Sequence, residues 1–374
     1  MNLLLFLNAY EEDGPGLLMA RIASKLQKHR DLRISTAALS RGGPLMKQFE
    51  NMDIPTHIVG MMGVFDWKRY RALVRFIKSG NFDIVHTNIL RADLFGRMAA
   101  HAARVPVIVS TEHGIHSWEY RGNFIRHLVR RIYLHTLSYT SKIIAVSDFV
   151  KKDLIHEGVP EQKIVRIFNG VDVDSFVPVP PEERDKWRAY ITDKPVKRTI
   201  GLVGNLIEMK GLRYFIRALP LILEKHPDTL VVVVGEGMLR NEMEAEVNRQ
   251  GFSSRVKFLG RITELTRRIM ASLDILVQPS LTESFGLTVA EALSCEVPVV
   301  ATKVGGLPDI IEDGVCGFLI PPKNPEALAA RVNQLLEDPG IIRSMGQAGR
   351  RRIMDRFSLS DTAQSYLELY RDLT

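Results

Sequence analysis

The chain has 374 residues, of which 45% are hydrophobic and 25% are charged, and this length predicts two globular domains. No apolar run approaches the ~20 residues that span a bilayer, and two cysteines are too few for a disulfide framework, so we expect a protein of the reducing cytoplasm. The formal net charge is +7, and all of the excess lies in residues 1–172, which carry 24 Lys and Arg against 16 Asp and Glu. This asymmetry indicates either general solubility or an anionic partner of the first half.

The first half alternates short apolar runs with helical stretches. Residues 3–7 form an apolar block without a basic flank or a cleavage site, so we interpret it as a buried first strand and not as a signal peptide. Strand, loop, helix and strand in short cycles are typical of a parallel sheet covered on both faces. Further strands are predicted at 33–40, 82–88, 105–113 and 141–147, and helices at 17–30 and 44–52.

A charged, proline-rich stretch at 176–198 interrupts this pattern and has no apolar period. We therefore predict an N-terminal domain over 1–172, a linker over 173–195 and a second α/β domain over 196–356, followed by a terminal helix in 357–374. In the second domain we predict strands at 199–205, 229–237, 255–261, 274–280, 297–302 and 317–322, with a helix over 211–227 among the connections.

Two parallel-sheet domains joined by a linker generally bind a ligand between them, at the carboxyl ends of the strands. The loop 204–211, GNLIEMKG, follows such a strand end and places Lys210 just before the helix that begins near Gly211. A lysine beside a helix N-terminus suits a phosphate, because free backbone N–H groups already favour negative charge there. The alternative is a solvated lysine, and the order of residues is not that of a Walker A loop.

The stretch ESFGLTVAE places Glu283 and Glu291 eight positions apart around a Phe-Gly pair. A helix predicted to start at about Gly286 leaves Glu283 in the preceding loop and Glu291 in the second turn. On one helix, eight residues would separate them by ~12 Å, beyond the ~5–9 Å of paired glycosidase carboxylates. We interpret them as two anchors on one extended ligand, with the backbone N–H groups of Phe285 to Leu287 facing an anion between them. The alternative is an ordinary helix start with two surface glutamates.

Three further features of the first half remain ambiguous. His113 ends a predicted strand at the expected ligand edge and is either structural or catalytic. Segments 66–78 and 121–133 mix arginines with an apolar stripe. Each is either a core-facing helix with a solvated outer face or a membrane-surface patch attracted to anionic lipid. We expect no nucleic acid partner, because no recognised motif or aromatic platform accompanies these arginines.

Over about residues 165–335 the chain resembles the family 4 glycosyltransferases, which use nucleotide-diphosphate sugars. The resemblance rests on NGVDVDSF at 169–176, GNLIEMKG, the E-x7-E element between PS and PVVAT, and GGLPDII at 305–311. It is weaker in the first half. The family has the GT-B fold, so the resemblance implies two Rossmann-like, doubly wound parallel-sheet domains with an interdomain cleft, and a C-terminal helix that crosses back to the first domain.

The resemblance also implies a role for each matching residue. Glu291 matches the family glutamate that holds the ribose hydroxyls, and Glu283 matches the one that binds hydroxyls of the donor sugar. Lys210 matches the lysine that neutralises the leaving diphosphate. Phe285, Gly286 and Leu287 match residues whose backbone amides face the sugar and the diphosphate.

Other matches lie on neighbouring loops. Arg261 and Ile262 correspond to the backbone that reads the nucleobase, and His113 to the histidine beside the donor sugar. Gly14 and Gly16 occupy the family's glycine loop, whose amides approach the phosphate or the acceptor. The resemblance thus assigns catalytic roles to His113, Lys210 and Glu283.

One position departs from the family pattern. Gly204 is followed by Asn205 where the family usually has an arginine, and an asparagine brings no positive charge to the leaving diphosphate. An alternative is therefore a non-catalytic subunit that binds a sugar nucleotide, and another is an epimerase with the same fold.

The leading hypothesis is a retaining glycosyltransferase that moves a sugar from a nucleotide diphosphate, with a UDP-sugar as the expected donor. The acceptor would be a saccharide or a lipid-linked hydroxyl in cell-surface polysaccharide, lipopolysaccharide or glycolipid synthesis. GT-B enzymes use cationic and amide donors in place of a divalent metal, so no metal or other cofactor is expected. The expected location is the cytoplasm, and the basic first half leaves open a peripheral association with the inner face of the membrane.

Overall fold

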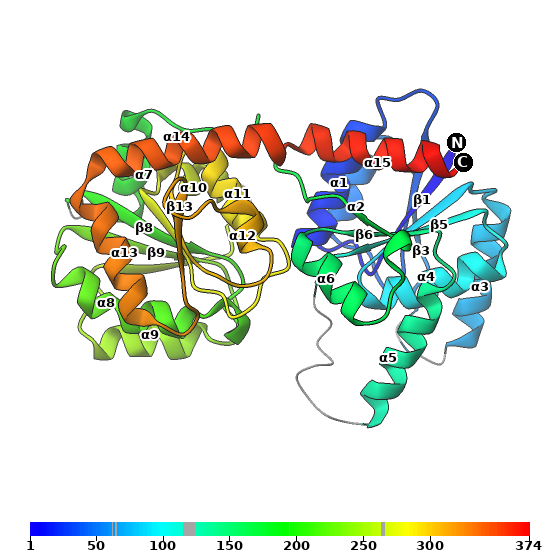
Figure 1. The fold of residues 1–374 in the computed structure, drawn as a ribbon, viewed down its shortest axis with the longest axis horizontal. Helices are drawn as coiled ribbons and strands as arrows, with labels where there is room; N and C mark the ends of the chain where they lie inside the picture. The colour runs from blue at the N-terminus through cyan, green and yellow to red at the C-terminus, as the bar shows by residue number, and fades with distance from the viewer. Residues whose placement is uncertain (62, 64–65, 115–123, 194, 263–265) are drawn as a thin grey trace. The chain divides into compact units, whose positions relative to one another are not determined.

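A computed structural model describes residues 1–374 except 62, 64–65, 115–123, 194 and 263–265. The chain forms two compact units, Met1–Gly170 together with Leu359–Thr374, and Val171–Ser358 (Figure 1). Each unit is built on its own parallel sheet, with helices in the connections between strands. The predicted fold class of two Rossmann-like, parallel-sheet domains is confirmed.

The sheet of the first unit has seven strands in the order β3-β2-β1-β4-β5-β6-β7, and every pair is parallel. The order reverses between β1 and β4, so loops leave the carboxyl edge in opposite directions there, which is the usual ligand position in such sheets. The strands are β1 (Asn2–Leu7), β2 (Arg33–Ala38), β3 (Thr56–Ile58), β4 (Ile84–Asn88), β5 (Val107–Glu112), β6 (Lys142–Ala145) and β7 (Ile164–Arg166).

Side chains of β1 alternate between the two faces of this sheet. Leu3 and Leu5 belong to a core with α1, α2 and α15, whereas Leu4 and Phe6 belong to a core with α3 and α4. Burying each such side chain stabilises the fold by about 1.5–3 kcal/mol. The helices are α1 (Gly14–Leu26), α2 (Pro44–Glu50), α3 (Trp67–Ser79), α4 (Leu90–Ala102), α5 (Phe124–Leu137), α6 (Asp148–His156) and α15 (Leu359–Leu373).

The C-terminal helix α15 is part of the first unit. In Figure 1 it lies along α1, and Tyr366 and Tyr370 are fully buried in the same core as β1. Tyr370 Oη lies 2.6 Å from His86 Nδ1, and His86 Nε2 lies 2.7 Å from Thr111 Oγ1. A buried polar network therefore ties the end of the chain to the centre of the first sheet.

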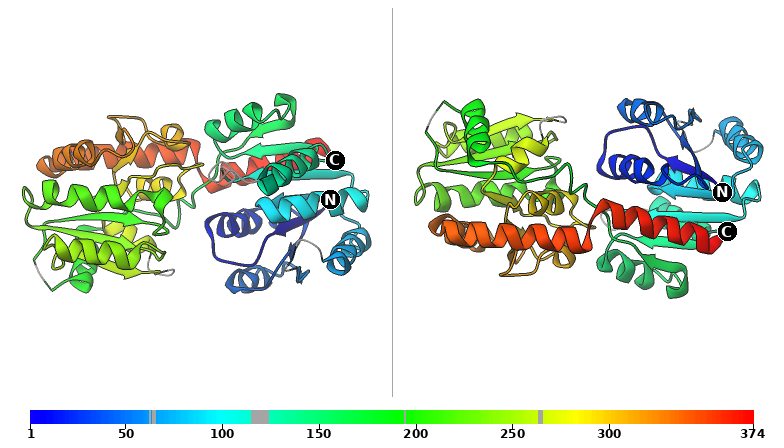
Figure 2. Two further views of the ribbon diagram at one scale, coloured as in Figure 1. Left: turned by 90° about the horizontal axis from the view of Figure 1, so that it is seen from below. Right: turned by 90° about the horizontal axis from the view of Figure 1, so that it is seen from above.

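The sheet of the second unit repeats the same topology. Its order is β10-β9-β8-β11-β12-β13, with the reversal between β8 and β11. Figure 2 shows helices on both faces of each sheet. The strands are β8 (Arg198–Val203), β9 (Thr229–Val234), β10 (Val256–Gly260), β11 (Ile275–Gln278), β12 (Val299–Thr302) and β13 (Gly317–Ile320). The helices are α7 (Pro181–Ile191), α8 (Leu212–Leu223), α9 (Arg240–Arg249), α10 (Thr266–Ser272), α11 (Leu287–Ser294), α12 (Leu307–Ile310), α13 (Pro325–Glu337) and α14 (Pro339–Arg356).

The stretch 173–195, which the sequence predicts to be a linker, contains α7 and belongs to the second unit. Arg188 of α7 donates to Asp274 Oδ2 at 2.7 Å and to Thr199 Oγ1 at 3.2 Å. Arg188, one of the charged residues of the predicted linker, therefore anchors α7 to partners from distant parts of the chain. In the described part of the chain, none of the helices has both the length and the apolar character needed to cross a membrane.

Candidate functional site

The carboxyl edge of the second sheet brings together two loops at the point where the strand order reverses. One loop follows β8 and ends in the short 3₁₀ helix Glu208–Lys210, and the other follows β11 and leads into α11. The two loops are joined directly, because the Leu281 N–H donates to the Met209 carbonyl at 2.8 Å. A side chain at either loop end can therefore reach the other.

The side chains of Lys210 and Glu283 form a second link between the two loops. Nζ of Lys210 lies 2.6 Å from Oε2 of Glu283, and their side chains are 25% and 14% exposed. The pair is thus partly shielded from water, yet open enough for a ligand to contact it. Gly211 allows the approach of the loops, since it has φ +67° and a Cβ there would lie 1.9 Å from the Pro279 carbonyl oxygen.

Glu283 is held from three sides. Ser280 donates to its Oε2 at 3.2 Å, and Gln278 in turn donates to Ser280 Oγ at 2.7 Å. The Gly306 N–H donates to the Glu283 carbonyl at 2.9 Å. A Cβ on Gly305, which has φ +54°, would lie 1.7 Å from that carbonyl oxygen, so this position requires glycine. The carboxylate is therefore presented in a preorganised position.

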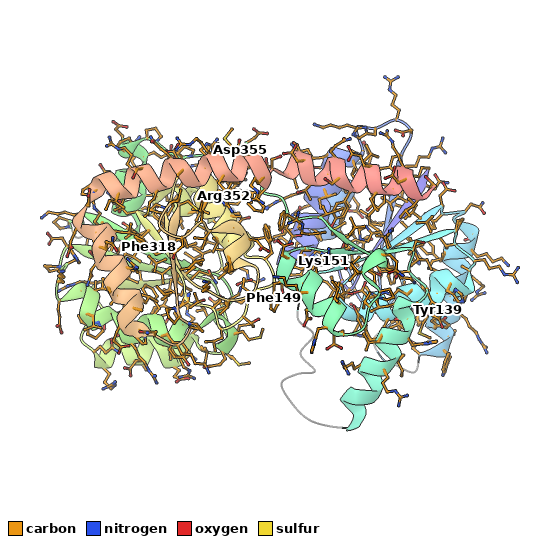
Figure 3. The ribbon with its side chains drawn as sticks, in the orientation of Figure 1. Tyr139, Phe149, Lys151, Phe318, Arg352 and Asp355 are labelled. Atoms are coloured by element: carbon orange, nitrogen blue, oxygen red, sulfur yellow. The ribbon has the colours of Figure 1, made fainter. Side chains whose placement is uncertain are left out.

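The short helix α12 behind Glu283 is itself anchored by α14. Arg352, labelled on α14 in Figure 3, donates to the carbonyls of Ile310 and Asp309 at 2.6 and 3.0 Å. These carbonyls lie at the C-terminal end of α12, where a cation also offsets the negative end of the helix. Arg352 thus supports the glycine pair that holds Glu283.

Helix α11 begins as the sequence predicts, with Gly286 as its N-cap and Leu287 as its first residue. No side chain caps this N-terminus, so its first N–H groups are available to a ligand in this described segment. Phe285 is buried against Phe357, with ring centroids 5.8 Å apart, and this contact fixes the entry into the helix. Glu291 follows in the second turn and is half-buried.

The remaining predicted residues of the second unit also lie at strand ends. Gly204 follows β8 and donates its N–H to the Val234 carbonyl at 2.9 Å, and Asn205 is exposed beside it. Arg261 and Ile262 follow β10, with Arg261 exposed. The structure therefore brings the predicted second-unit residues to the carboxyl edge of one sheet.

In the first unit, His113 follows β5 directly. Its Nε2 lies 3.1 Å from Oδ1 of Asn88, which ends the adjacent strand β4. Burial lowers the pKa of His113 to about 4, against an opposing effect of the neighbouring Glu112 carboxylate. The ring is therefore neutral at pH 7.

The glycine loop of the first unit differs from expectation in one respect. The helix starts at Gly14, and the Gly16 N–H donates to Oδ1 of Asp13 at 2.7 Å. Burial raises the pKa of Asp13. The Gly16 amide, expected to face a phosphate or acceptor, is thus already bonded to a capping carboxylate in this conformation.

Sequence reasoning missed several supporting residues. Gln278, Ser280, Arg352 and Asn88 carry no motif of their own, and their roles depend on contacts across the fold. The Gly305–Gly306 pair was visible within GGLPDII, but its packing against Glu283 was not. Among the described residues, no group of three or more His, Cys, Asp or Glu side chains is arranged to hold a metal ion.

The structure describes the two basic segments, 66–78 and 121–133, to different extents. In 66–78 the apolar stripe is turned into the protein, since Leu73 and Ile77 of α3 are buried in the core. The apolar stripe therefore faces the core, and the exposed face of the helix carries Trp67 together with basic side chains. Of segment 121–133, residues 121–123 and the side chains of 124–129 lie outside the described residues.

Comparison with known proteins gives matches over both units. The family described as "Glycosyl transferases group 1" matches residues 183–352, and "Glycosyltransferase Family 4" matches residues 13–175. An uncharacterized glycosyltransferase of Methanocaldococcus jannaschii is 30% identical over 300 residues, which are 78% of this chain and 75% of that protein.

Two further similar proteins have names that state a substrate or a bound ligand. The UDP-Gal:alpha-D-GlcNAc-diphosphoundecaprenol alpha-1,3-galactosyltransferase of Escherichia coli is 26% identical over 324 residues, 86% of this chain and 83% of that protein. The structure of Anabaena Alr3699/HepE in complex with UDP and glucose matches with a TM-score of 0.87 and 25% identity over 99% of each chain.

Proposed function

The chain belongs to the group 1, or family 4, glycosyltransferases, and from this we propose that it transfers a sugar from a UDP-sugar to an acceptor hydroxyl with retention of anomeric configuration. The observation that carries the proposal is the Lys210–Glu283 pair, 2.6 Å apart at the strand-order reversal of the second sheet. This edge is where open α/β sheets bind nucleotides. The complexes of Anabaena HepE with UDP and glucose support the choice of donor.

Each group at this edge suits one part of such a donor. Lys210 has three N–H donors and can keep its contact with Glu283 while it binds a phosphate oxygen. The uncapped N-terminus of α11 adds backbone N–H groups from Phe285 to Leu287 for the same diphosphate. Glu283 then accepts hydrogen bonds from the sugar hydroxyls, and Glu291 accepts them from the ribose.

Neutralising the diphosphate is the main chemical task of the site. A nucleoside diphosphate is a good leaving group once its charge is offset, so preorganised cationic and amide donors lower the barrier more than a carboxylic acid would. We propose that these donors act without a divalent metal. Arg261 and Ile262 would contact the nucleobase, and His113, Gly14 and Gly16 would face the donor sugar, phosphate or acceptor from the first unit.

A second candidate is a non-catalytic subunit that binds a sugar nucleotide. The observation in its favour is Asn205, which is exposed at the end of β8 where the family usually carries an arginine. Such a subunit would still bind the sugar nucleotide through Lys210, the cation of this loop, but it would not transfer the sugar. An epimerase on the same fold would release free nucleotide or a changed sugar without any acceptor.

The test is incubation with a panel of nucleotide sugars, with release of the nucleotide and the product sugar measured with and without EDTA. We expect UDP release from one UDP-sugar, unchanged by EDTA, with water as the acceptor in this assay and the α-anomer of the free sugar as the first product of an α-linked donor. Nucleotide binding without turnover of any donor would support the subunit instead. Loss of activity in EDTA would contradict the metal-free mechanism.

We propose a saccharide or lipid-linked acceptor at the membrane surface, in cell-surface polysaccharide, lipopolysaccharide or glycolipid synthesis, because the Escherichia coli relative is a transferase to a diphosphoundecaprenol-linked sugar. The protein would act from the cytoplasm, in peripheral contact with the inner face of the membrane. The feature that supports contact is α3, where Trp67 is 62% exposed beside the exposed Lys68, Arg71 and Arg75.

This proposal predicts salt-sensitive binding to anionic vesicles in a flotation assay. Replacing Arg71 and Arg75 with glutamate is expected to weaken binding by at least about tenfold, since each basic side chain near an anionic surface contributes about 1 kcal/mol. The matched control is glutamate at Lys186 and Arg267, which are exposed on the second unit. Equal loss in both double variants, or no binding by the unmodified protein at low salt, would contradict a role for α3.

A further inference from the structure

The carboxyl ends of β4 and β5 place Asn88 and His113 in contact. Asn88 pairs with Thr111 in the sheet register, and His113 follows two residues after Thr111. Asn88 is fully buried, and its Oδ1 lies 3.1 Å from Nε2 of the half-buried His113. The amide and the ring are therefore fixed relative to each other by two central strands.

The orientation of the Asn88 amide sets which ring nitrogen of His113 carries the proton. With Oδ1 facing the ring, Nε2 donates and the neutral ring is the Nε2–H tautomer, whereas an amide turned the other way would donate from Nδ2 and select the Nδ1–H tautomer. In the Nε2–H tautomer, Nδ1 has a free lone pair. Among the described residues, no hydrogen-bond partner of Nδ1 is present.

The charge state follows from the groups around the ring. Burial lowers the pKa of His113 to about 4, the Glu112 carboxylate acts in the opposite direction, and His86 on the adjacent strand is also neutral because burial lowers its pKa to about 3. Tyr366 and Tyr370 of α15 contact His86, and burial raises the pKa of each hydroxyl. His113 is thus an uncharged hydrogen-bond acceptor at neutral pH.

An asparagine at position 88, at the buried end of a strand, lowers the stability of the folded protein. Its Nδ2 is buried without a hydrogen-bond partner in the described structure, which an apolar side chain of the same size would avoid. The next residue, Ile89, has φ +73°, a conformation that a β-branched side chain rarely adopts. Unpaired polar groups and backbone strain of this kind are concentrated at functional sites. Stability alone does not account for an asparagine here.

We propose that Asn88 is a positioning residue that holds His113 in the Nε2–H tautomer, so that Nδ1 accepts a hydrogen bond from a hydroxyl group of the sugar substrate. The inference rests on the proposed glycosyltransferase site and adds a chemical specificity to it. A lone pair on Nδ1 attracts a hydroxyl hydrogen and repels a phosphate oxygen. His113 therefore recognises the sugar and contributes nothing to the binding of the nucleotide alone.

The main test is Asn88→Leu, which keeps the size of the side chain and removes its polar atoms. We expect an unchanged or higher Tm, unchanged binding of UDP by calorimetry, and a fall in the turnover of the UDP-sugar by about 10- to 100-fold because the ring is no longer oriented. The control is Thr111→Val, which removes a buried hydroxyl from the same two strands and bonds His86 instead of His113. It is expected to lower Tm and to leave turnover per folded molecule unchanged.

The tautomer is measured directly in the ligand-free protein by ¹⁵N-histidine NMR, with the His113 signals assigned by their loss in His113→Gln. We expect the Nε2–H tautomer in the unmodified protein and a mixture of tautomers in Asn88→Leu. Asn88→Asp should place a carboxylate beside the ring, raise the pKa of His113 and move the acid limb of the pH–rate profile upward by about one to three pH units.

Either of two results would overturn the inference: an Nδ1–H tautomer in the unmodified protein, or equal losses of stability and turnover in Asn88→Leu and Thr111→Val. The proposed function fails separately, through the absence of turnover with every nucleotide sugar. In that case the NMR experiment still decides whether Asn88 orients His113.

Discussion

Replacing Lys210 with alanine is expected to lower the turnover number for sugar transfer by about 100- to 1,000-fold, the usual effect of removing one preorganised donor to a developing charge. Nζ of Lys210 is held 2.6 Å from Glu283 and shares this edge with the uncapped N-terminus of α11. Without the ammonium group, the departing diphosphate keeps only backbone amides. Binding of UDP weakens as well, but by less, because the amides and the nucleobase contacts remain.

The measurement is steady-state transfer with the donor identified in the panel, together with calorimetric titration of UDP. The matched control is Lys197→Ala, since Lys197 also pairs with a carboxylate, Asp228, at 2.8 Å but just before β8, at the opposite edge of the same sheet. We expect that control to keep full activity. Equal activity in the two variants would show that Lys210 does not stabilise the leaving group. Lys210→Arg should restore part of the activity, because it keeps the charge and changes its geometry.

Replacing Arg97 with methionine is expected to lower the free energy of unfolding of the first unit by about 3–5 kcal/mol, the usual effect of removing one partner of a buried ion pair. Arg97 of α4 is completely buried. Its Nη2 lies 2.9 Å from Glu112 Oε1 and 3.6 Å from Asp93 Oδ1, and its Nε donates to Ser110 at 2.7 Å. Methionine fills the space but leaves the two carboxylates without their cation.

Hydrogen exchange followed by mass spectrometry suits this test, because the chain has two units and a single unfolding transition is not assured. Peptides of β4 and β5 should lose protection, whereas peptides of the second unit serve as an internal reference. The control is Arg371→Met, since Arg371 pairs with Asp31 at 2.8 Å on the surface of the same unit and is 46% exposed. Exposed pairs contribute about 0–1 kcal/mol. Similar losses in the two variants would contradict the burial argument.

The sequence predicted much of the fold from local patterns. Apolar runs such as Leu3 to Leu7 and Thr229 to Val234 lack polar alternation, and the structure places both in interior strands of parallel sheets. The sequence predicted a helix from about Gly286, carrying Leu287 and the apolar residues after it, and α11 begins at Leu287 with Gly286 as its N-cap. Such features depend on residues that are close together in the chain, so they can be predicted from the local sequence.

Charged residues were harder to place. The stretch 173–195 was predicted to be a linker, yet Arg188 within it is bound to Asp274 and Thr199. Arg97 of α4 is completely buried, with Ser110 and Glu112 of β5 and Asp93 of its own helix as partners. A charge is solvated or buried according to whether a distant partner meets it, and no local pattern contains that information.

The sequence by itself determined the family, the two parallel-sheet domains and the strand-end loops that carry Lys210, Glu283 and His113. Only the tertiary structure decided how these side chains are held. Lys210 meets Glu283 across 73 positions of the chain, and Asn88 meets His113 across 25. The periodicity of a strand or helix specifies which face a residue occupies, but the distance between two functional atoms is set by how strands align and how closely loops approach, as Gly211 and Gly305 allow here. That is why the chemistry could be named from residues, and the contact between Asn88 and His113 only from the structure.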